Sequence, residues 1–149
     1  MTELVVREKL ALEEKTFLHH LTSLLDEVIV GRPETYPTAQ QVHHELGLYL
    51  SAINPMLSLY EQGLSSLSVW LRDQQLPALS GLVVNKTTRR PSDIFFQLFQ
   101  KNRADITWWH EQIAKAVYLD WQPYLQNVSS KNPFAGQRIL ILDEPDLYR

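Results

Sequence analysis

The sequence predicts a mainly α-helical fold of five or six helices with a small two-stranded β element, in one domain that covers residues 1–149. Long stretches without Gly or Pro carry apolar side chains at helical spacing, which is the primary signal for helices. Only two short runs, 81–85 and 138–142, have the branched aliphatic composition of strands. Apolar residues make up 44% and charged residues 21% of the chain, and these fractions are typical of a globular protein that buries its own core.

The first predicted element is a long amphipathic helix over residues 2–30, a segment with no Gly and no Pro. One helical stripe of this segment is apolar and consists of Leu10, Phe17, Leu21, Leu24 and Val28. Gly31, Pro33 and Pro37 follow and predict the loop that ends the helix. If the stripe is wider than the rest of the domain covers, the helix would pair with a second copy, and a two-fold symmetric homodimer is the expected geometry.

A short second helix is predicted over residues 38–46. Thr38 and Gln41 have the spacing of a capping box, in which the two side chains accept hydrogen bonds from free backbone N–H groups of the first turn. Gly47 follows the helix, and Gly is the residue that most often ends one.

A third helical region is predicted over residues 51–75, where Pro55 fits only in the first turn. Gly63 near its centre favours a division into two shorter helices. The next run, 81–85, has the sequence Gly-Leu-Val-Val-Asn and is the best candidate for a strand in the first hundred residues.

A polar turn at 86–91 follows, and Ser92 then caps a short helix with an apolar face. A last long helix is predicted to start at Asp105 or Thr107 and to end near Pro123. The remaining residues are predicted to form a loop, a second strand and a tail, at 127–137, 138–142 and 143–149.

The order of elements over residues 38–91 resembles that of a winged helix-turn-helix: a positioning helix, a recognition helix and a β-wing. Lys86, Arg89 and Arg90 would lie at the tip of the wing, where they would reach nucleic-acid phosphates or a groove. The expected recognition helix, 51–63, has Asn and Gln side chains that can contact base edges but no Arg or Lys. The alternative is a helical domain with a solvated basic loop.

Charge is unevenly distributed along the chain. The formal net charge is -3, which excludes a strongly basic protein that coats nucleic acid without specificity. Residues 71–103, however, hold six basic and two acidic residues, and the rest of the chain is net acidic. Lys101 and Arg103 belong to this basic segment and are predicted to support the three cations of the turn in binding nucleic acid.

The segment 76–91 resembles part of a group of small, uncharacterised bacterial proteins, in which Leu-Pro, a Leu-Val-Val-Asn-Lys run and a Thr-Gly-x-Pro-Gly turn occur together. The chain keeps most of this pattern, at Leu76, Pro77, Leu82–Lys86, Thr88 and Pro91. Arg89 and Ser92 stand where the pattern has Gly. The resemblance, extended over residues 38–121, implies an origin in a bacterium or mobile element and assigns no catalytic residue.

Motifs for catalysis are incomplete. Ile139–Pro145 resembles the Walker B segment of ATPases, but the chain has no phosphate-binding glycine-lysine loop to accompany it. The histidines, His19, His20, His43, His44 and His110, lack the His-x-x-x-His spacing of a zinc site. A site with one His from each of three helices is conceivable, and a metal-dependent enzyme is therefore the third hypothesis. We predict no catalytic residue, no metal site and no cofactor.

Trp108 is predicted to lie at a protein-interaction surface, because the core stripe of the last helix runs through Trp109 instead. The alternative for Trp108 is packing against the first helix. The absence of Cys, of a signal peptide and of a membrane-spanning run predicts a cytoplasmic protein with no membrane partner. The leading hypothesis is a non-enzymatic, nucleic-acid-associated or regulatory binding protein of bacterial or phage type. The alternative is a helical protein-interaction module, such as an inhibitor or assembly factor, that binds no nucleic acid.

Overall fold

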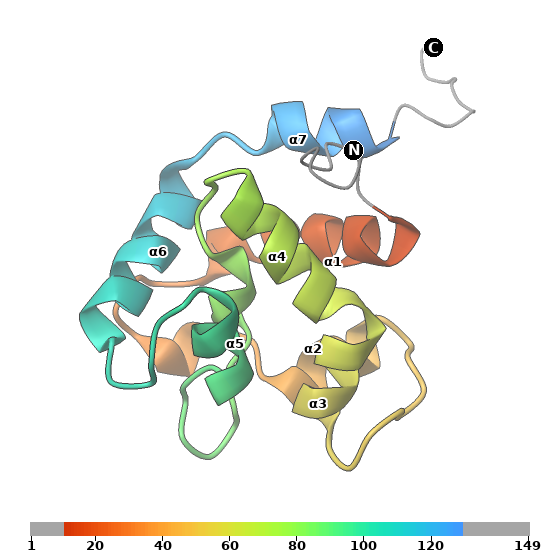
Figure 1. Cartoon of the computed structure of the whole chain (residues 1–149), viewed down its shortest axis with the longest axis vertical. Helices are drawn as coiled ribbons and strands as arrows, with labels where there is room; N and C mark the ends of the chain where they lie inside the picture. The colour runs from red at the N-terminus through yellow and green to blue at the C-terminus, as the bar shows by residue number, and fades with distance from the viewer. Residues whose placement is uncertain (1–10, 130–149) are drawn as a thin grey trace.

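The computed structural model describes residues 11–129, and the fold is mainly helical, as predicted. Figure 1 shows α4 at the centre, with α1 behind it, α6 on one side and the α2–α3 pair on the other. The helices are α1 (Leu12–Ser23), α2 (Ala39–Glu45), α3 (Pro55–Leu59), α4 (Ser65–Asp73), α5 (Asp93–Leu98), α6 (Ile106–Tyr118) and α7 (Gln122–Ser129). Among the described residues, no helix has the length and apolar character needed to cross a membrane.

The first helix is shorter than predicted. It ends at Ser23, a 3₁₀ turn follows over Leu25–Glu27, and the backbone is extended at Val28. The β-branched run 28–30 disfavours helix, and both the N–H and the C=O of Ile29 hydrogen-bond to the Thr35 hydroxyl, at 2.9 and 3.5 Å. These contacts give the loop an alternative to helical hydrogen bonding.

The apolar stripe of α1 is covered by the domain itself. Phe17, Leu18 and Leu21 are at most 2% exposed, because α1 packs against α4, α7 and the turn between α3 and α4. We predicted pairing of this helix with a second copy only if its apolar stripe were left uncovered. Over residues 17–21 the stripe is covered, so that condition is not met there. Residues 2–10 of the predicted helix lie outside the described part of the chain.

The caps of α2 form as predicted. The Thr38 hydroxyl accepts from the Gln41 N–H at 3.1 Å, and the Gln41 side-chain oxygen accepts from the Thr38 N–H at 3.4 Å. Gly47 ends the helix with φ +67°, and its N–H donates to the His44 carbonyl oxygen at 3.0 Å. Local side chains determine these boundaries, which is why sequence spacing alone predicts them.

The third helical region is divided at Gly63, as predicted. Its first helix, α3, starts at Pro55 and not at Ser51, because the Asn54 side chain accepts from the Leu57 N–H and caps it there. A wider π-type turn, Tyr60–Leu64, joins α3 to α4, and Gly63 inside it has φ +145°. A side chain there would also lie only 3.0 Å from the Phe17 ring, so the bend and the close contact with α1 both require Gly.

The predicted strand at 81–85 is wrong. Leu79–Leu82 form a 3₁₀ turn, and the only β contact among the described residues is an isolated bridge between Thr38 and Val84. Leu82, Val83 and Val84 are all fully buried, and no described strand pairs with this apolar run. The second predicted strand, 138–142, lies outside the described residues.

Without strands, residues 11–129 contain no β-wing, and the predicted winged-helix fold is not supported. The order of a helix, a turn, a second helix and a later basic loop is nevertheless kept, and α2 packs against α3. In place of a sheet, two backbone hydrogen bonds fix the base of the loop: Val84 N–H to the Pro37 oxygen, and Ala39 N–H to the Val84 oxygen, both at 3.0 Å.

The C-terminal helices begin where predicted but end differently. Ser92 caps α5 through the Ile94 N–H at 3.1 Å, and α6 starts directly after Asp105. The chain turns after Tyr118, and Pro123 lies in the first turn of α7, where the missing N–H costs nothing. Pro123 therefore does not end the last long helix, as predicted, but lies at the start of another one. Residues 127–129, predicted to be part of a loop, belong to this helix.

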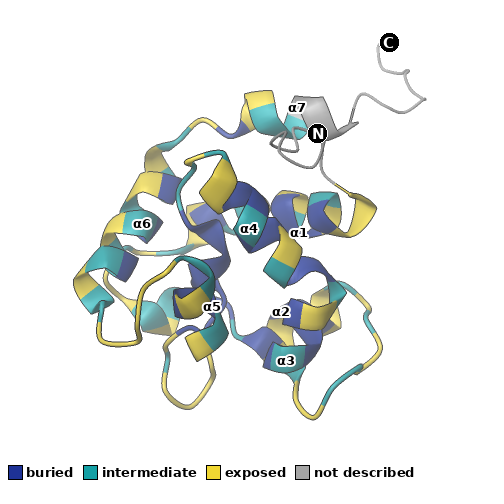
Figure 2. Ribbon diagram, viewed as in Figure 1, coloured by how far each residue is buried: buried dark blue, intermediate teal, exposed yellow. Residues whose placement is uncertain are grey.

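The core lies between α4, α6 and the segment 78–84. Figure 2 shows buried residues concentrated along α4 and the chain that descends from it, with exposed residues at the outer loops. Trp109 of α6 is 1% exposed and donates its indole N–H to the Gly81 oxygen at 2.9 Å. Gly81 has no room for a side chain, because a Cβ would lie 2.6 Å from the Phe95 ring.

Candidate nucleic-acid interface

The basic loop at 85–90 is a closed turn held by its own backbone. The Asn85 N–H donates to the Arg90 oxygen, and the Arg89 N–H donates to the Asn85 oxygen, both at 2.8 Å. The Asn85 side-chain oxygen also accepts from the N–H groups of Thr87 and Thr88, at 2.8 and 3.2 Å. The loop therefore presents its cations from a defined backbone even though it has no supporting sheet.

Arg89 has left-handed backbone geometry, with φ +56°. This conformation favours Gly. The Asn85–Arg90 closure forms all the same, with a strain cost of about 1–2 kcal/mol for a non-Gly residue.

Lys86 lies beside the start of α2 and the start of α3. Its Nζ atom donates to the Gln40 side-chain oxygen of α2 at 3.5 Å. A hollow of about 230 Å³ separates the loop from the start of α3. Its lining consists of Ala39, Gln40, Asn54, Pro55, Asn85, Lys86 and Thr87. The hollow thus combines one cation with several amide and hydroxyl groups.

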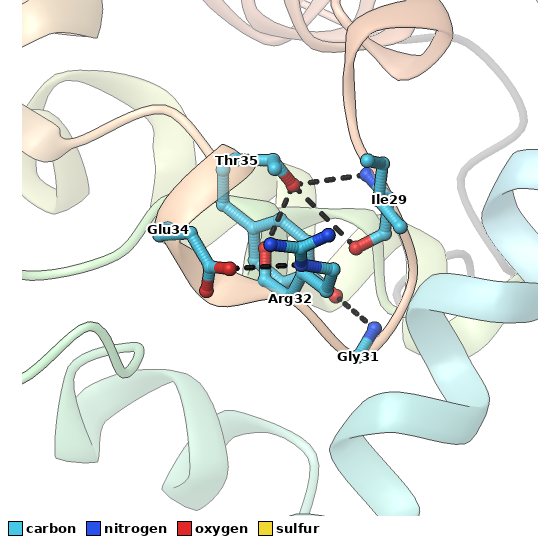
Figure 3. Close-up of polar contacts among 6 residues, drawn as sticks. Ile29, Gly31, Arg32, Glu34 and Thr35 are labelled. Atoms are coloured by element: carbon cyan, nitrogen blue, oxygen red, sulfur yellow. Dashed lines mark hydrogen bonds and ion pairs between the residues drawn. The ribbon is translucent and has the colours of Figure 1, made fainter.

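Arg89 faces a different neighbour, the loop 29–36. Figure 3 shows the contacts that hold this loop, in which the Thr35 hydroxyl bonds to Ile29 and the Arg32 side chain bonds to Glu34. Arg89 and Glu34 line one hollow of about 260 Å³ together with Glu27. The pKa of the Glu34 carboxyl lies below its ordinary value, because it accepts from its own backbone N–H and from Arg32, with a further contribution from Arg89. Nearby carboxylates therefore offset part of the charge of Arg89.

The five cations predicted to bind nucleic acid form two groups. Lys86, Arg89 and Arg90 lie in the loop that precedes α5, whereas Lys101 and Arg103 lie in the loop that follows it (Figure 1). Arg90 is exposed. Arg103 is paired with Asp93 at 3.8 Å, with both side chains largely exposed, and such a pair contributes little to stability.

Trp108 is half-buried and packs against α5, not against the first helix. Its ring centroid lies 5.6 Å from that of Phe95 and 5.8 Å from that of Phe99. The Lys101 ammonium lies 5.4 Å from the Trp108 ring centroid, within the range of a cation–π interaction. The structure thus brings Lys101 and Trp108 together, although the sequence assigned them to different interfaces.

The histidines have separate structural partners. His20 bonds to Glu45 at 2.8 Å, His43 bonds to Ser58 at 2.8 Å in the interior, and His110 stacks on Trp109. Burial, together with the neighbouring Lys15, lowers the pKa of His19. Within residues 11–129, no group of three or more His, Cys, Asp or Glu is placed to hold a metal ion.

Of the two amide residues at the interface, Asn54 belongs to the expected recognition helix 51–63, whose Asn and Gln side chains were predicted to contact base edges, whereas Gln40 was not predicted. Asn54 precedes Pro55 and could have been recognised as a helix cap, but no local signal brings Gln40 next to Lys86. Comparison of the chain with protein-family models, with curated proteins and with solved structures finds no match. The chemistry of the surface is therefore the basis on which a function can be assigned.

Proposed function

We propose that the protein is a non-enzymatic nucleic-acid-binding protein. Its ligand contacts the basic loop and the adjacent starts of α2 and α3. The observation that carries this proposal is the position of Lys86 beside the amide side chains of Gln40 and Asn54, at one hollow. Cations contact phosphates and fix the position of a nucleic acid, whereas amide side chains form hydrogen bonds with base edges. The hollow combines both kinds of group.

The distribution of charge supports the same face. Lys86 and Arg90 are exposed and are the two cations of the loop that remain available for phosphates, since Glu34 and Glu27 lie near Arg89. Two backbone hydrogen bonds join the base of the loop to the start of α2. The cations of the loop and the amide group of Gln40 are therefore fixed relative to each other, so the protein would rearrange little when it binds a ligand.

The test is fluorescence anisotropy with labelled duplex DNA and single-stranded RNA at two salt concentrations. The Lys86→Ala, Arg90→Ala double variant is compared with Lys15→Ala, which removes a cation of α1 outside the interface. We expect the double variant to bind more weakly and to lower the salt slope by about 0.9 for each duplex phosphate that it no longer neutralises. An unchanged slope, or no binding by the folded wild-type protein at low salt, would contradict the proposal.

A second candidate function, a protein-interaction module, is favoured by the exposed apolar side chains of the α2–α3 loop. Tyr49, Leu50 and Ile53 are 75%, 56% and 87% exposed, and such a cluster on one loop is unusual for a surface without a partner. Photo-crosslinking from position 49 in cells, with the also highly exposed Tyr118 as control, distinguishes the two functions. Protein adducts specific to position 49, without nucleic-acid adducts, would favour this second function.

A further inference from the structure

A separate hollow of about 310 Å³ lies between the C-terminal end of α4, the α5–α6 loop and α6. Its lining divides into three cations, two amides and an apolar wall, namely Arg72, Lys101, Lys115, Gln75, Gln112, Leu76, Pro77, Phe99 and Trp108. No Asp or Glu is among these residues. The cations come from three different elements, and we refer to this hollow as the α4–α6 groove.

Two of the cations are held in place by contacts within the protein. The Arg72 guanidinium donates to the Leu98 oxygen at 3.0 Å and to the Asp73 carboxylate at 3.3 Å. These bonds leave further N–H groups of the guanidinium free to donate, because Arg has five. Lys101 is held over the Trp108 ring at 5.4 Å. An anion in the groove would therefore meet charges that already have defined positions.

The other side of the groove provides an apolar wall and an amide donor. Phe99 and Trp108 lie next to each other, with ring centroids 5.8 Å apart, and Pro77 extends the wall. The Gln112 side-chain oxygen accepts from the Ala78 N–H at 3.0 Å. Its NH₂ group is therefore left to donate to a ligand.

We propose that the α4–α6 groove binds one nucleotide, with its phosphate at Arg72, Lys101 and Lys115 and its base against the wall of Phe99 and Trp108. Charge complementarity favours a phosphate, because Lys101, Lys115 and the Asp73-paired Arg72 line the groove and no carboxylate is among the lining residues. The volume is at the lower limit of small-ligand sites, which begin at about 300 Å³, so the groove accepts a single nucleotide and not a duplex. The nucleotide is either free or an unpaired residue of a strand, and only the second case rests on the proposed function.

The experiment is isothermal titration calorimetry of the full chain with nucleoside monophosphates, with a single-stranded tetranucleotide and with inorganic phosphate. The groove variant is Lys101→Gln, Lys115→Gln. The matched control is Lys15→Gln, Arg32→Gln, which removes the same number of cations outside the groove. Because each charge-assisted contact contributes about tenfold in affinity, we expect the groove variant to weaken nucleotide binding by at least that factor and the control to leave it unchanged.

The different ligands distinguish a free nucleotide from an unpaired residue of a strand. They also distinguish the α4–α6 groove from the interface proposed at the basic loop. Tighter binding of the tetranucleotide than of monophosphates identifies a strand residue, and equal binding identifies a free nucleotide. A Lys86→Ala, Arg90→Ala variant that loses duplex binding but keeps nucleotide binding supports both sites independently. A glutamate-rich peptide is titrated as a further anionic ligand. The proposal is overturned if inorganic phosphate binds as tightly as nucleotides, if the peptide binds more tightly than they do, or if the folded protein binds no nucleotide. Each of these outcomes is independent of what the basic loop binds.

Discussion

The Nε2 atom of His43 lies 2.8 Å from the hydroxyl oxygen of Ser58, in the interior between α2 and α3. The Ser58 hydroxyl is fully buried and also accepts from the Ser51 N–H at 3.0 Å and from the Gln62 side-chain nitrogen at 2.8 Å. It also lies 3.2 Å from the Ser51 hydroxyl and donates to the Tyr49 carbonyl oxygen at 3.5 Å. This pair is therefore not an accessible nucleophile with its base but an anchor, which fixes the apolar α2–α3 loop.

Ser58→Ala is expected to destabilise the protein, because the Ser51 N–H and the His43 ring nitrogen would be left without their buried partner. The expected decrease in the free energy of unfolding is about 1–3 kcal/mol, measured by urea denaturation. Ser66→Ala is the matched control, since Ser66 is exposed and its hydroxyl makes one bond, to the Gly63 oxygen at 3.3 Å. Equal decreases in the two variants would show that the anchor carries no stability.

Tyr60→Phe and Tyr36→Phe should change stability in opposite directions. The Tyr60 hydroxyl is buried without a hydrogen-bond partner among the described residues, and burial raises its pKa. The Tyr36 hydroxyl instead accepts from the Gly31 N–H at 3.1 Å. Removing the first is expected to stabilise by about 1 kcal/mol and removing the second to destabilise by a similar amount. Thermal unfolding of both variants tests the signs, and a destabilised Tyr60→Phe protein would contradict the assignment.

Arg89→Gly should stabilise the basic loop, because Gly adopts φ +56° without strain. The gain is limited by the greater freedom of Gly in the unfolded chain, and a net value of about 0.5–1 kcal/mol is expected. Arg90→Gly is the control, since position 90 has no left-handed backbone and Gly there only adds freedom. Urea denaturation that ranks the two variants the other way round would be inconsistent with strain at position 89.

Stability should fall as the solution becomes acidic. The folded-state pKa of His19 lies below its ordinary value of 6.5, so the unfolded chain binds the proton more readily, and unfolding is favoured as the pH drops below that value. The effect is small because His19 is only partly buried and keeps a share of its surface in contact with solvent. Urea denaturation at pH 7.5 and 5.5 is expected to show a smaller pH difference for His19→Gln than for the wild type. The exposed His44 is the control, and an equal change in His44→Gln would contradict the assignment.

The sequence predicts those parts of the fold that neighbouring residues determine. Thr38 with Gln41, Gly47 and Ser92 set helix boundaries through contacts within a few residues, and all were predicted correctly. The segment 81–85 was mispredicted because its conformation depends on distant residues, such as Trp109, whose indole donates to Gly81. An apolar run buried on all sides has the same composition whether it forms a strand or a 3₁₀ turn.

The candidate sites show the same difference between features set by neighbouring residues and features set by distant ones. Lys86, Arg89 and Arg90 are neighbours in the sequence and share one loop, so the pattern of charge is enough to group them as one candidate site. The α4–α6 groove was missed because Arg72 and Lys115 are far apart in the chain and come to line one hollow only through the packing of α4, α5 and α6. Residues 138–142 lie outside the described part of the chain, and their predicted strand stays a prediction.

The bridge between Thr38 and Val84 also bears on how quickly a ligand would be captured. It joins the start of α2 directly to the base of the basic loop, so these two parts have no hinge between them and would move as one body. A surface of this kind needs no slow rearrangement before contact, and association at about 10⁵–10⁷ M⁻¹ s⁻¹ is then set by diffusion and orientation. Differences in affinity among ligands would accordingly arise in the rate at which each one leaves.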